Sequence, residues 1–139
     1  MSGGVDVGKT HLAIAVARRW LARSRPAKFS LVPKLLDELR EGYRPDAQID
    51  YTARFDVFCN ADLLILDDLG MESPTRWAQE KLDMIIDHRY INGLPLMITT
   101  NLGVRGLPER MASRLMRARG AHWVNLDAPE YRLKRKPRG

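Results

Sequence analysis

The sequence has few of the features that mark secreted or membrane proteins. Its 139 residues include a single cysteine, Cys59, so an internal disulfide is excluded and a cytoplasmic location is expected. The longest apolar runs, at residues 63–66 and 94–98, are far shorter than the roughly 18 residues of a membrane-spanning helix. Met1 is followed by Ser-Gly-Gly and not by a basic and apolar stretch, so no secretory signal is expected. These absences predict a cytoplasmic protein with no membrane partner.

The composition is that of a folded domain. Hydrophobic residues make up 45% of the chain and charged residues 29%, which argues against disorder. A length of 139 residues is close to the commonest size of one domain, so two separate cores are not expected. We predict one domain over residues 1–126 and a basic tail over residues 127–139.

The positive charge is unevenly distributed. The formal net charge is +6, and the excess of basic residues lies in two segments, residues 105–119 with five arginines and one glutamate, and residues 132–139 with five basic residues and no acid. The rest of the chain is slightly acidic. Either basic segment could face the phosphates of a nucleic acid. The alternative is a solvated helix face and a frayed terminus.

Helical and strand patterns alternate along the chain, with no internal repeat and no linker. The alternation predicts an α/β fold in which helices flank a parallel sheet. The run at residues 63–66 is apolar on both faces, as in a central strand. Five helices are expected, at residues 9–24, 33–42, 51–60, 73–92 and 108–118, with four strands at residues 28–32, 63–66, 96–100 and 122–126.

A phosphate-binding loop is indicated near the start of the chain. Residues 3–10 read Gly-Gly-Val-Asp-Val-Gly-Lys-Thr and match G-x-x-x-x-G-K-[ST]. Glycines let backbone amides surround the phosphates, and the N-terminus of the following helix adds positive potential. Lys9 is then expected to reach the β and γ phosphates and Thr10 to place its hydroxyl on Mg²⁺. The competing interpretation is a glycine-rich tail.

A second pair of residues follows the apolar run at residues 63–66. Asp67 and Asp68 come directly after it, at the carboxyl end of a predicted buried strand. Asp67 is expected to hold the magnesium shell, and Asp68 to orient or deprotonate an attacking water. Because aspartate is shorter than glutamate, we expect slow turnover. On its own, such a pair is often a loop cap.

Two further polar elements complete the candidate site. Asn101 ends the next predicted strand and could hold the attacking water or a γ oxygen, although an ordinary strand-to-loop turn also uses asparagine. Arg110 and Arg114 lie on the last predicted helix, from which an arginine could reach the γ-phosphate bound by a neighbouring subunit. A solvated basic helix is the alternative for these arginines.

With these residues in place, the chain resembles the ATPase domain of bacterial replicative helicase loaders, the DnaC/DnaI family of AAA+ proteins. The IstB transposition helpers are related to that family. The resemblance extends over nearly all 139 residues, in the family's order. The matching stretches are residues 8–13 (GKTHLA), 63–70 (LLILDDLG), 77–90 (WAQEKLDMIIDHRY), 94–102 (LPLMITTNL) and 109–115 (ERMASRL).

The resemblance implies a P-loop NTPase fold of the AAA+ type and an ATP-dependent switch. In such a switch, subunits associate through their nucleotide sites, contact single-stranded DNA and help to place the replicative helicase on it. The Asp67-Asp68 ending resembles the loaders more than the transposition helpers, which more usually carry Asp-Glu. The implied roles are ATP binding for Gly3, Gly8, Lys9, Thr10 and His11, Mg²⁺ binding for Thr10 and Asp67, and catalysis for Asp68, Asn101 (sensor 1) and Arg114 (an arginine finger acting in trans).

The chain departs from the family in three places. Asp6 stands where the family usually has glycine, and a carboxylate there repels phosphate unless it turns outward. The family's first strand, central in the sheet, precedes the phosphate loop, whereas only Met1 and Ser2 precede Gly3. The N-terminal region with which loaders grip the helicase is not in the sequence. We therefore expect the first central strand to be missing and the chain to be a fragment.

Three functions remain open on these grounds, besides a weaker fourth, a metabolite kinase with a phosphate loop, for which no acceptor-binding segment is visible. The first is a helicase loader switched by ATP on single-stranded DNA. The second is a transposition helper that uses the same ATPase to deliver a transposase. The third is an inactive truncated remnant or adaptor that binds a helicase or DNA through its basic segments without hydrolysis.

Overall fold

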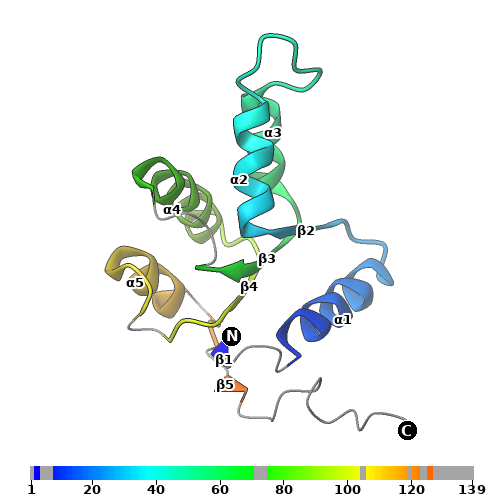
Figure 1. The fold of residues 1–139 in the computed structure, drawn as a ribbon. Helices are drawn as coiled ribbons and strands as arrows, with labels where there is room; N and C mark the ends of the chain where they lie inside the picture. The colour runs from blue at the N-terminus through cyan, green and yellow to red at the C-terminus, as the bar shows by residue number, and fades with distance from the viewer. Residues whose placement is uncertain are drawn as a thin grey trace, which may run out of the picture.

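The computed structural model describes residues 2–3, 8–70, 75–103, 106–118, 120–122 and 125–126. Within these ranges the chain forms one parallel sheet with strand order β2-β3-β4-β1-β5 (Figure 1). The predicted α/β class with a parallel sheet is therefore confirmed. The strands are β1 (Ser2–Gly3), β2 (Ala27–Leu31), β3 (Leu63–Leu69), β4 (Leu96–Thr100) and β5 (Asn125–Leu126).

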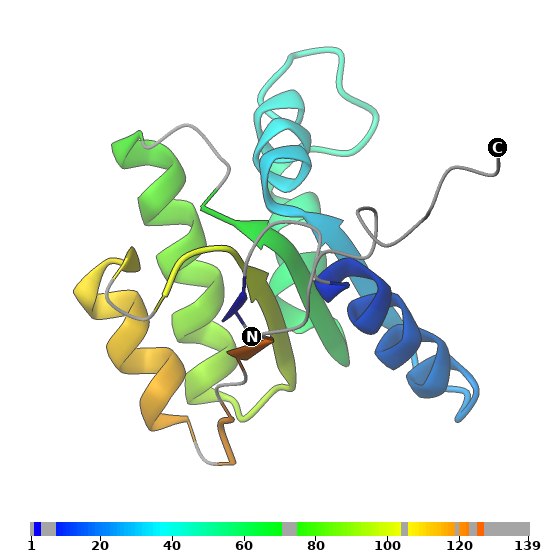
Figure 2. The ribbon, with the colours of Figure 1, turned by 60° about the horizontal axis from the view of Figure 1, so that its bottom comes forward.

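The helices cover the sheet on two faces (Figures 1 and 2). Among the described helices, α1 is the one that packs on the first of these faces, where Ala13 meets Leu63 and Ile65 of β3. The other four helices form the larger core on the opposite face, around the side chains of Leu64, Leu66 and Ile98. The bounds are α1 (Lys9–Leu21), α2 (Val32–Glu41), α3 (Tyr51–Asn60), α4 (Arg76–Ile91) and α5 (Glu109–Arg117).

Strand β3 occupies the centre of the best-paired part of the sheet. It pairs with β2 over five residues, from Ala27↔Leu63 to Leu31↔Asp67, and with β4 on its other side. Both of its faces are covered by helices, which explains why its first five residues are all buried. The unbroken apolar run at residues 63–66 is thus a central strand, as predicted.

Several predicted boundaries shift. Helix α1 ends at Leu21 and not at residue 24, where Ser24 adopts a positive φ of 57° that breaks the helix. Val32 begins α2 and does not end β2, because Pro33 fixes a helical φ for the first turn. Thr75 caps α4 by accepting a hydrogen bond from the Ala78 amide, while the predicted Ser73-Pro74 start lies outside the described residues.

The strand expected to be missing ahead of the phosphate loop is represented by two residues. Ser2–Gly3 form β1 between β4 and β5, with Ser2 opposite both Thr100 and Asn125. The position between β4 and β5 is therefore filled, though only over this length, and the described residues form five strands where the sequence predicts four. Strand β5 covers the end of the predicted strand at residues 122–126, and the predicted tail at residues 127–139 lies outside the described ranges.

A buried arginine fixes the start of β4 against the helices. Arg89 of α4 is 1% exposed and donates hydrogen bonds to the carbonyl oxygens of Phe58, Cys59 and Pro95. Burial lowers the pKa of its guanidinium. These bonds satisfy the carbonyl groups at the end of α3 and the carbonyl group of the residue just before β4.

No helix within the described ranges is both long and apolar enough to cross a membrane.

Candidate nucleotide-binding site

The N-terminus of α1 has the backbone geometry of a phosphate-binding loop. Gly8 caps the helix with a φ of 90°, a left-handed conformation that favours glycine. Gly8 has no side chain with which to cap the helix, and the first turn contains no acidic residue. The positive end of the helix dipole at this N-terminus favours an anion. Residues 4–7 of the loop, including Asp6, lie outside the described residues.

Lys9 and Thr10 open the helix beneath this loop. Lys9 is 5% exposed at the first helical position, whereas Thr10 and His11 are exposed. The Thr10 hydroxyl donates to the carboxylate of Asp67, at 3.0 Å from Oδ2 and 3.3 Å from Oδ1. The structure therefore brings together the two residues that the sequence assigns to Mg²⁺.

Asp67 is fully buried near the end of β3. Besides Thr10, its carboxylate accepts a hydrogen bond from the hydroxyl of Thr99 on β4. The same Thr99 oxygen accepts from the Asp68 amide at 3.0 Å. Thr99 thus ties the two aspartates to the neighbouring strand, and Asp67 lies between a threonine of α1 and a threonine of β4.

A bulge in β3 makes this bridge possible. Leu66 pairs with Ile98 and Leu69 pairs with Thr100, so Asp67 and Asp68 together lie opposite the single residue Thr99. Asp68 accommodates the extra residue with a φ of 61°, in the left-handed region that aspartate tolerates better than most residues. Backbone of this kind is often found at functional sites. Sequence reasoning missed Thr99, and its only signal was a polar residue near the end of a strand.

The other two polar residues at the end of β4 differ in their hydrogen bonds, because Thr100 is bonded to the backbone and Asn101 faces solvent. The Thr100 hydroxyl donates to the Leu69 carbonyl at 2.6 Å and accepts from the Leu102 amide at 3.0 Å. Asn101 is exposed at the residue after β4. Because β3 and β4 are parallel neighbours, Asn101 lies at the same sheet edge as Asp67 and Asp68. Its side chain makes no hydrogen bond within the described ranges.

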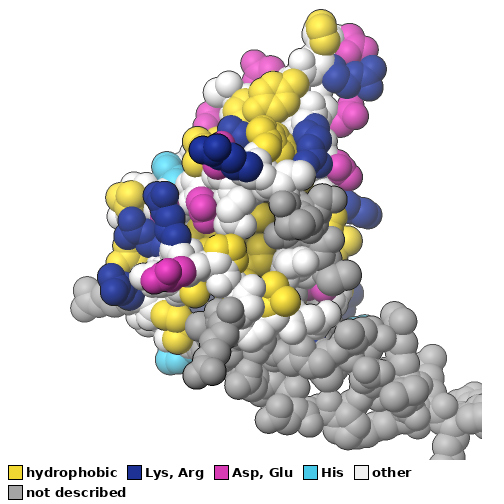
Figure 3. All heavy atoms as spheres, turned by 60° about the vertical axis from the view of Figure 1, so that its left-hand side comes forward, with side chains coloured by type: hydrophobic (Ala, Val, Ile, Leu, Met, Phe, Trp, Pro, Cys, Tyr) yellow, Lys and Arg dark blue, Asp and Glu magenta, His cyan; other side chains and the backbone are white. Residues whose placement is uncertain are grey.

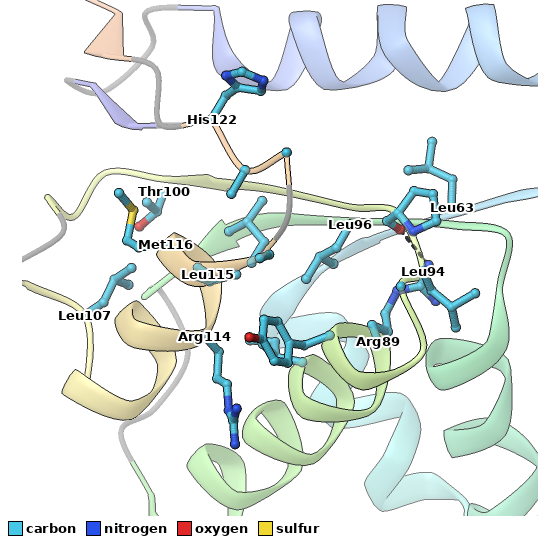
Figure 4. A pocket seen from close by; sticks show the side chains of 18 residues that line it. Leu63, Arg89, Leu94, Leu96, Thr100, Leu107, Arg114, Leu115, Met116 and His122 are labelled. Carbon is cyan, nitrogen blue, oxygen red and sulfur yellow. Dashed lines mark hydrogen bonds between the residues drawn. The ribbon is translucent and has the colours of Figure 1, made fainter.

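Arg114 lies away from the loop residues, on α5. Its Nε is 3.0 Å from Oδ1 of Asp87 on α4, and its guanidinium lies 5.1 Å from the centre of the Tyr90 ring. The side chain extends from α5 toward α4 and away from Thr100 (Figure 4). Within one chain, therefore, the structure pairs Arg114 with Asp87 and Tyr90 of α4.

A cavity of about 520 Å³ borders Arg114 and is lined by residues of β4, α4 and α5 and of the segments that follow α4 and α5 (Figure 4). It belongs to the face of the sheet that carries the larger core, whereas Thr10 and Asp67 meet beneath α1 on the other face. The cavity and the candidate nucleotide site are therefore separate features.

The two oxygen ligands at Thr10 and Asp67 fit magnesium better than a metal that needs three or four protein ligands. Mg²⁺ prefers hard oxygen ligands and is usually held by one or two protein oxygens together with phosphates and water. A hydroxyl and a carboxylate 3.0 Å apart beside the helix N-terminus match that pattern. In the described part of the chain, no group of three or more histidine, cysteine, aspartate or glutamate residues could hold a metal without such help.

Comparison with known proteins assigns the family. Residues 1–138 match the family described as IstB-like ATP binding protein. A putative ATP-binding protein in an insertion sequence of Mycobacterium tuberculosis is 28% identical over 99% of this chain and 56% of its own length. The replicative helicase loader DnaC of Escherichia coli is 24% identical over 94% of this chain and 54% of its length. The chain thus spans about half the length of these relatives.

The fold agrees with this assignment. A crystal structure of DnaI superimposes with a TM-score of 0.74 and 26% identity, over 93% of this chain and 69% of that one. The predicted AAA+ type of P-loop fold and the resemblance to the DnaC/DnaI loaders are confirmed by these matches. On the match over residues 1–138, the chain belongs to the family of IstB-like ATP-binding proteins.

Proposed function

We propose that the chain binds ATP with Mg²⁺ between the N-terminus of α1 and the end of β3, and hydrolyses it slowly. The observation that supports this most is the contact of the Thr10 hydroxyl with the buried carboxylate of Asp67. Gly3, Gly8, Lys9 and His11 complete the nucleotide-binding set of the proposal. The bound Mg²⁺ would neutralise charge on the β and γ phosphates.

The same proposal gives three residues a part in hydrolysis. Asp68 and Asn101 orient the attacking water at the edge of the sheet where β3 and β4 end. Arg114 acts in trans, on ATP bound by a neighbouring copy, which is consistent with its 40% exposed side chain. Self-association through the nucleotide site therefore belongs to the proposal.

For the biological role we favour an ATP-switched loader that helps to place a replicative helicase on single-stranded DNA. The support is the similarity to DnaC and DnaI and the Asp67-Asp68 ending, which the loaders share. Helix α5 carries three basic residues, Arg110, Arg114 and Arg117, of which the first two pair with Asp87 and Arg117 remains for a DNA phosphate in this proposal. On the side of the molecule that Figure 3 brings forward, basic side chains alternate with acidic ones.

A transposition helper is the second candidate. The match of residues 1–138 to the IstB-like family and the 28% identity to an insertion-sequence protein favour it. Both candidates require the same ATPase and differ in the protein that is delivered. Co-purification with a replicative helicase supports the first, and co-purification with a transposase supports the second.

The ATPase is tested by phosphate release with and without Mg²⁺, in the unchanged protein and in Lys9→Ala and Arg114→Ala variants. We expect Lys9→Ala to abolish ATP binding, and Arg114→Ala to keep binding while lowering kcat by about a hundredfold or more. Release that rises more than linearly with protein concentration indicates the assembly. Release no greater than that of Lys9→Ala would favour the third reading, an inactive remnant or adaptor.

DNA binding is tested by a salt series with single-stranded oligonucleotides. Because neutralised phosphates release counterions, affinity should fall steeply as salt rises. An affinity that is independent of salt would remove the electrostatic role of the basic segments. Binding to duplex DNA of the same length is the control.

A further inference from the structure

Two arginines of α5 share one carboxylate of α4. Arg110 and Arg114 lie one turn apart, so they project from the same side of α5. The Nη2 atom of Arg110 is 2.9 Å from Oδ2 of Asp87, and the Nε atom of Arg114 is 3.0 Å from Oδ1 of the same residue. Each oxygen of Asp87 therefore holds a different arginine.

The contact restrains Arg114 through the inner part of its guanidinium. The closest approach to Asp87 is at Nε, which carries one of the five donor N–H groups, while the two Nη atoms carry the other four. Two parallel N–H donors of a guanidinium can bind a phosphate, and the two Nη atoms offer such a pair when Nε is engaged. The Tyr90 ring, 5.1 Å from the guanidinium carbon, supports the group from another side. Arg114 is thus contacted at Nε by Asp87, and its guanidinium lies over the ring of Tyr90.

The exposure of the three side chains fits this arrangement. Asp87 is 20% exposed, whereas Arg114 is 40% and Arg110 is 68% exposed. The carboxylate is therefore partly shielded between the helices, and the arginine that it orients still reaches solvent. A free arginine samples many rotamers, and a partner that fixes its rotamer in advance lowers the entropic cost of a later contact.

We propose that Asp87 is a positioning residue for Arg114, which orients the guanidinium toward a phosphate bound by a neighbouring copy of this chain. The inference rests on the proposed function, because it requires Arg114 to act in trans. Asp87 touches no nucleotide and acts only through the arginine. Arg110 occupies the second oxygen of Asp87 and so keeps the carboxylate facing α5.

Mixed assemblies separate this role from a general effect on folding. The acceptor is Arg114→Ala, which keeps the nucleotide site and lacks the arginine. The first donor is Lys9→Ala, which has no working nucleotide site and supplies Arg114. ATP hydrolysis by the mixture then reports the arginine of the donor acting on the acceptor's nucleotide.

Asp87 is changed in the donor, in two ways. Asp87→Asn removes the charge, and Asp87→Glu moves the carboxylate outward by one methylene. We expect either change in the Lys9→Ala donor to lower the kcat of the mixture by about threefold to tenfold, because misplacement of about 1 Å at a reacting group is costly. The KM for ATP should stay the same, since the acceptor's site is untouched.

Two controls give the experiment its specificity. Asp87→Asn in the acceptor should leave kcat unchanged, because the acceptor's own Arg114 is already absent, whereas a merely structural role would lower kcat from either side. Asp56→Asn in the donor should also leave kcat unchanged. Asp56 is exposed on α3, away from α5, and it makes no ion pair in the described part of the chain.

The possible outcomes separate the two claims. If the first donor does not restore hydrolysis to the acceptor, the trans role of Arg114 is wrong and this inference fails with the proposed function. If that donor restores hydrolysis and both Asp87 variants restore it equally well, only the positioning role is wrong. If Asp87→Asn does not fold at the assay temperature, as judged by its thermal melt, the Asp87→Glu donor decides by the same comparison.

Discussion

The Oγ1 atom of Thr10 lies 3.0 Å from Oδ2 of Asp67, although 57 residues separate them in the chain. Thr10 is in the first turn of α1 and Asp67 is near the end of the buried strand β3. Because α1 packs against the face of the sheet on which Ala13 meets Leu63 and Ile65, its N-terminus is directed to the carboxyl end of β3. The packing of one helix thus assembles the candidate magnesium ligands.

Thr99→Val should destabilise the fold. The substitution preserves shape but removes the hydroxyl that donates to Asp67 and accepts from the Asp68 amide. An unpaired buried polar group costs about 1–3 kcal/mol, so the free energy of unfolding should fall by that amount in a urea titration. Thr52→Val, at an exposed position of α3, is the control and should change it by less than about 0.5 kcal/mol. Equal effects would show that the bridge contributes nothing.

Gly8→Ala should destabilise the phosphate-binding loop through backbone strain and not through a steric clash. Nothing lies within 4 Å of an added Cβ, but the φ of 90° is strained for alanine. We expect a loss of about 1 kcal/mol or more in unfolding free energy and weaker ATP binding. Gly103→Ala is the matched control, since its Cβ also meets open space and its φ is not in the left-handed region. If the two variants behave alike in both measurements, the conformation of Gly8 is not what the loop requires.

Cys59 should be unreactive in the folded protein at pH 8. It is 4% exposed, and burial, with a smaller contribution from the nearby carboxylate of Asp56, raises the pKa of its thiol to about 11. The thiolate, which is the reactive form, is therefore scarce as well as shielded. A disulfide reagent should label less than one equivalent over the time in which a free thiol reacts fully, and one equivalent in urea. Rapid labelling of the native protein would contradict this burial.

Asp83→Asn should raise the melting temperature at pH 7. Burial raises the pKa of the Asp83 carboxyl, while hydrogen bonding from Gln79 and the charge of Arg110 oppose the rise. Since the folded pKa exceeds the unfolded one, the charged form destabilises the folded state, and stability falls as the pH rises through that window. The advantage of asparagine should vanish below the ordinary value of 3.8, where the carboxyl is protonated in both states. Melts at pH 7 and pH 3 test the sign, and a variant that melts lower at pH 7 would contradict it.

The parts of the site that sequence reasoning predicted are local in the chain. The spacing of Gly8, Lys9 and Thr10 already defines a loop that opens a helix, and four apolar residues before Asp67 already define a buried strand. The carboxyl ends of neighbouring parallel strands lie at one edge of a sheet. These facts were enough to predict that Thr10 and Asp67 meet.

The bulge could not be predicted in this way. The apolar run suggested that the strand ends at Leu66, whereas β3 continues to Leu69 through the left-handed residue Asp68. The irregularity depends on the register with β4, which lies some thirty residues further along the chain. Pairing between residues so far apart in the chain cannot be predicted from a local sequence pattern. The role of Thr99 was therefore not predicted.

The partner of Arg114 was hidden for a related reason. Its spacing on α5 is compatible with a solvated basic helix, and only the packing of α5 on α4 shows that Asp87 lies opposite.

The sequence also left the first residue of α4 ambiguous. Ser73 and Thr75 are both suitable capping residues two positions apart, and the Thr75 side chain takes that role.

The most direct test of the central claim is a calorimetric titration of ATP into the unchanged protein and into Asp67→Asn, each with Mg²⁺ and with EDTA. Asparagine keeps the shape of Asp67 and removes the charge that would hold the metal. The account predicts that Mg²⁺ strengthens ATP binding to the unchanged protein by at least about tenfold, and that the gain is lost in Asp67→Asn. An equal gain in both proteins, or no binding of ATP to the unchanged protein, would contradict it.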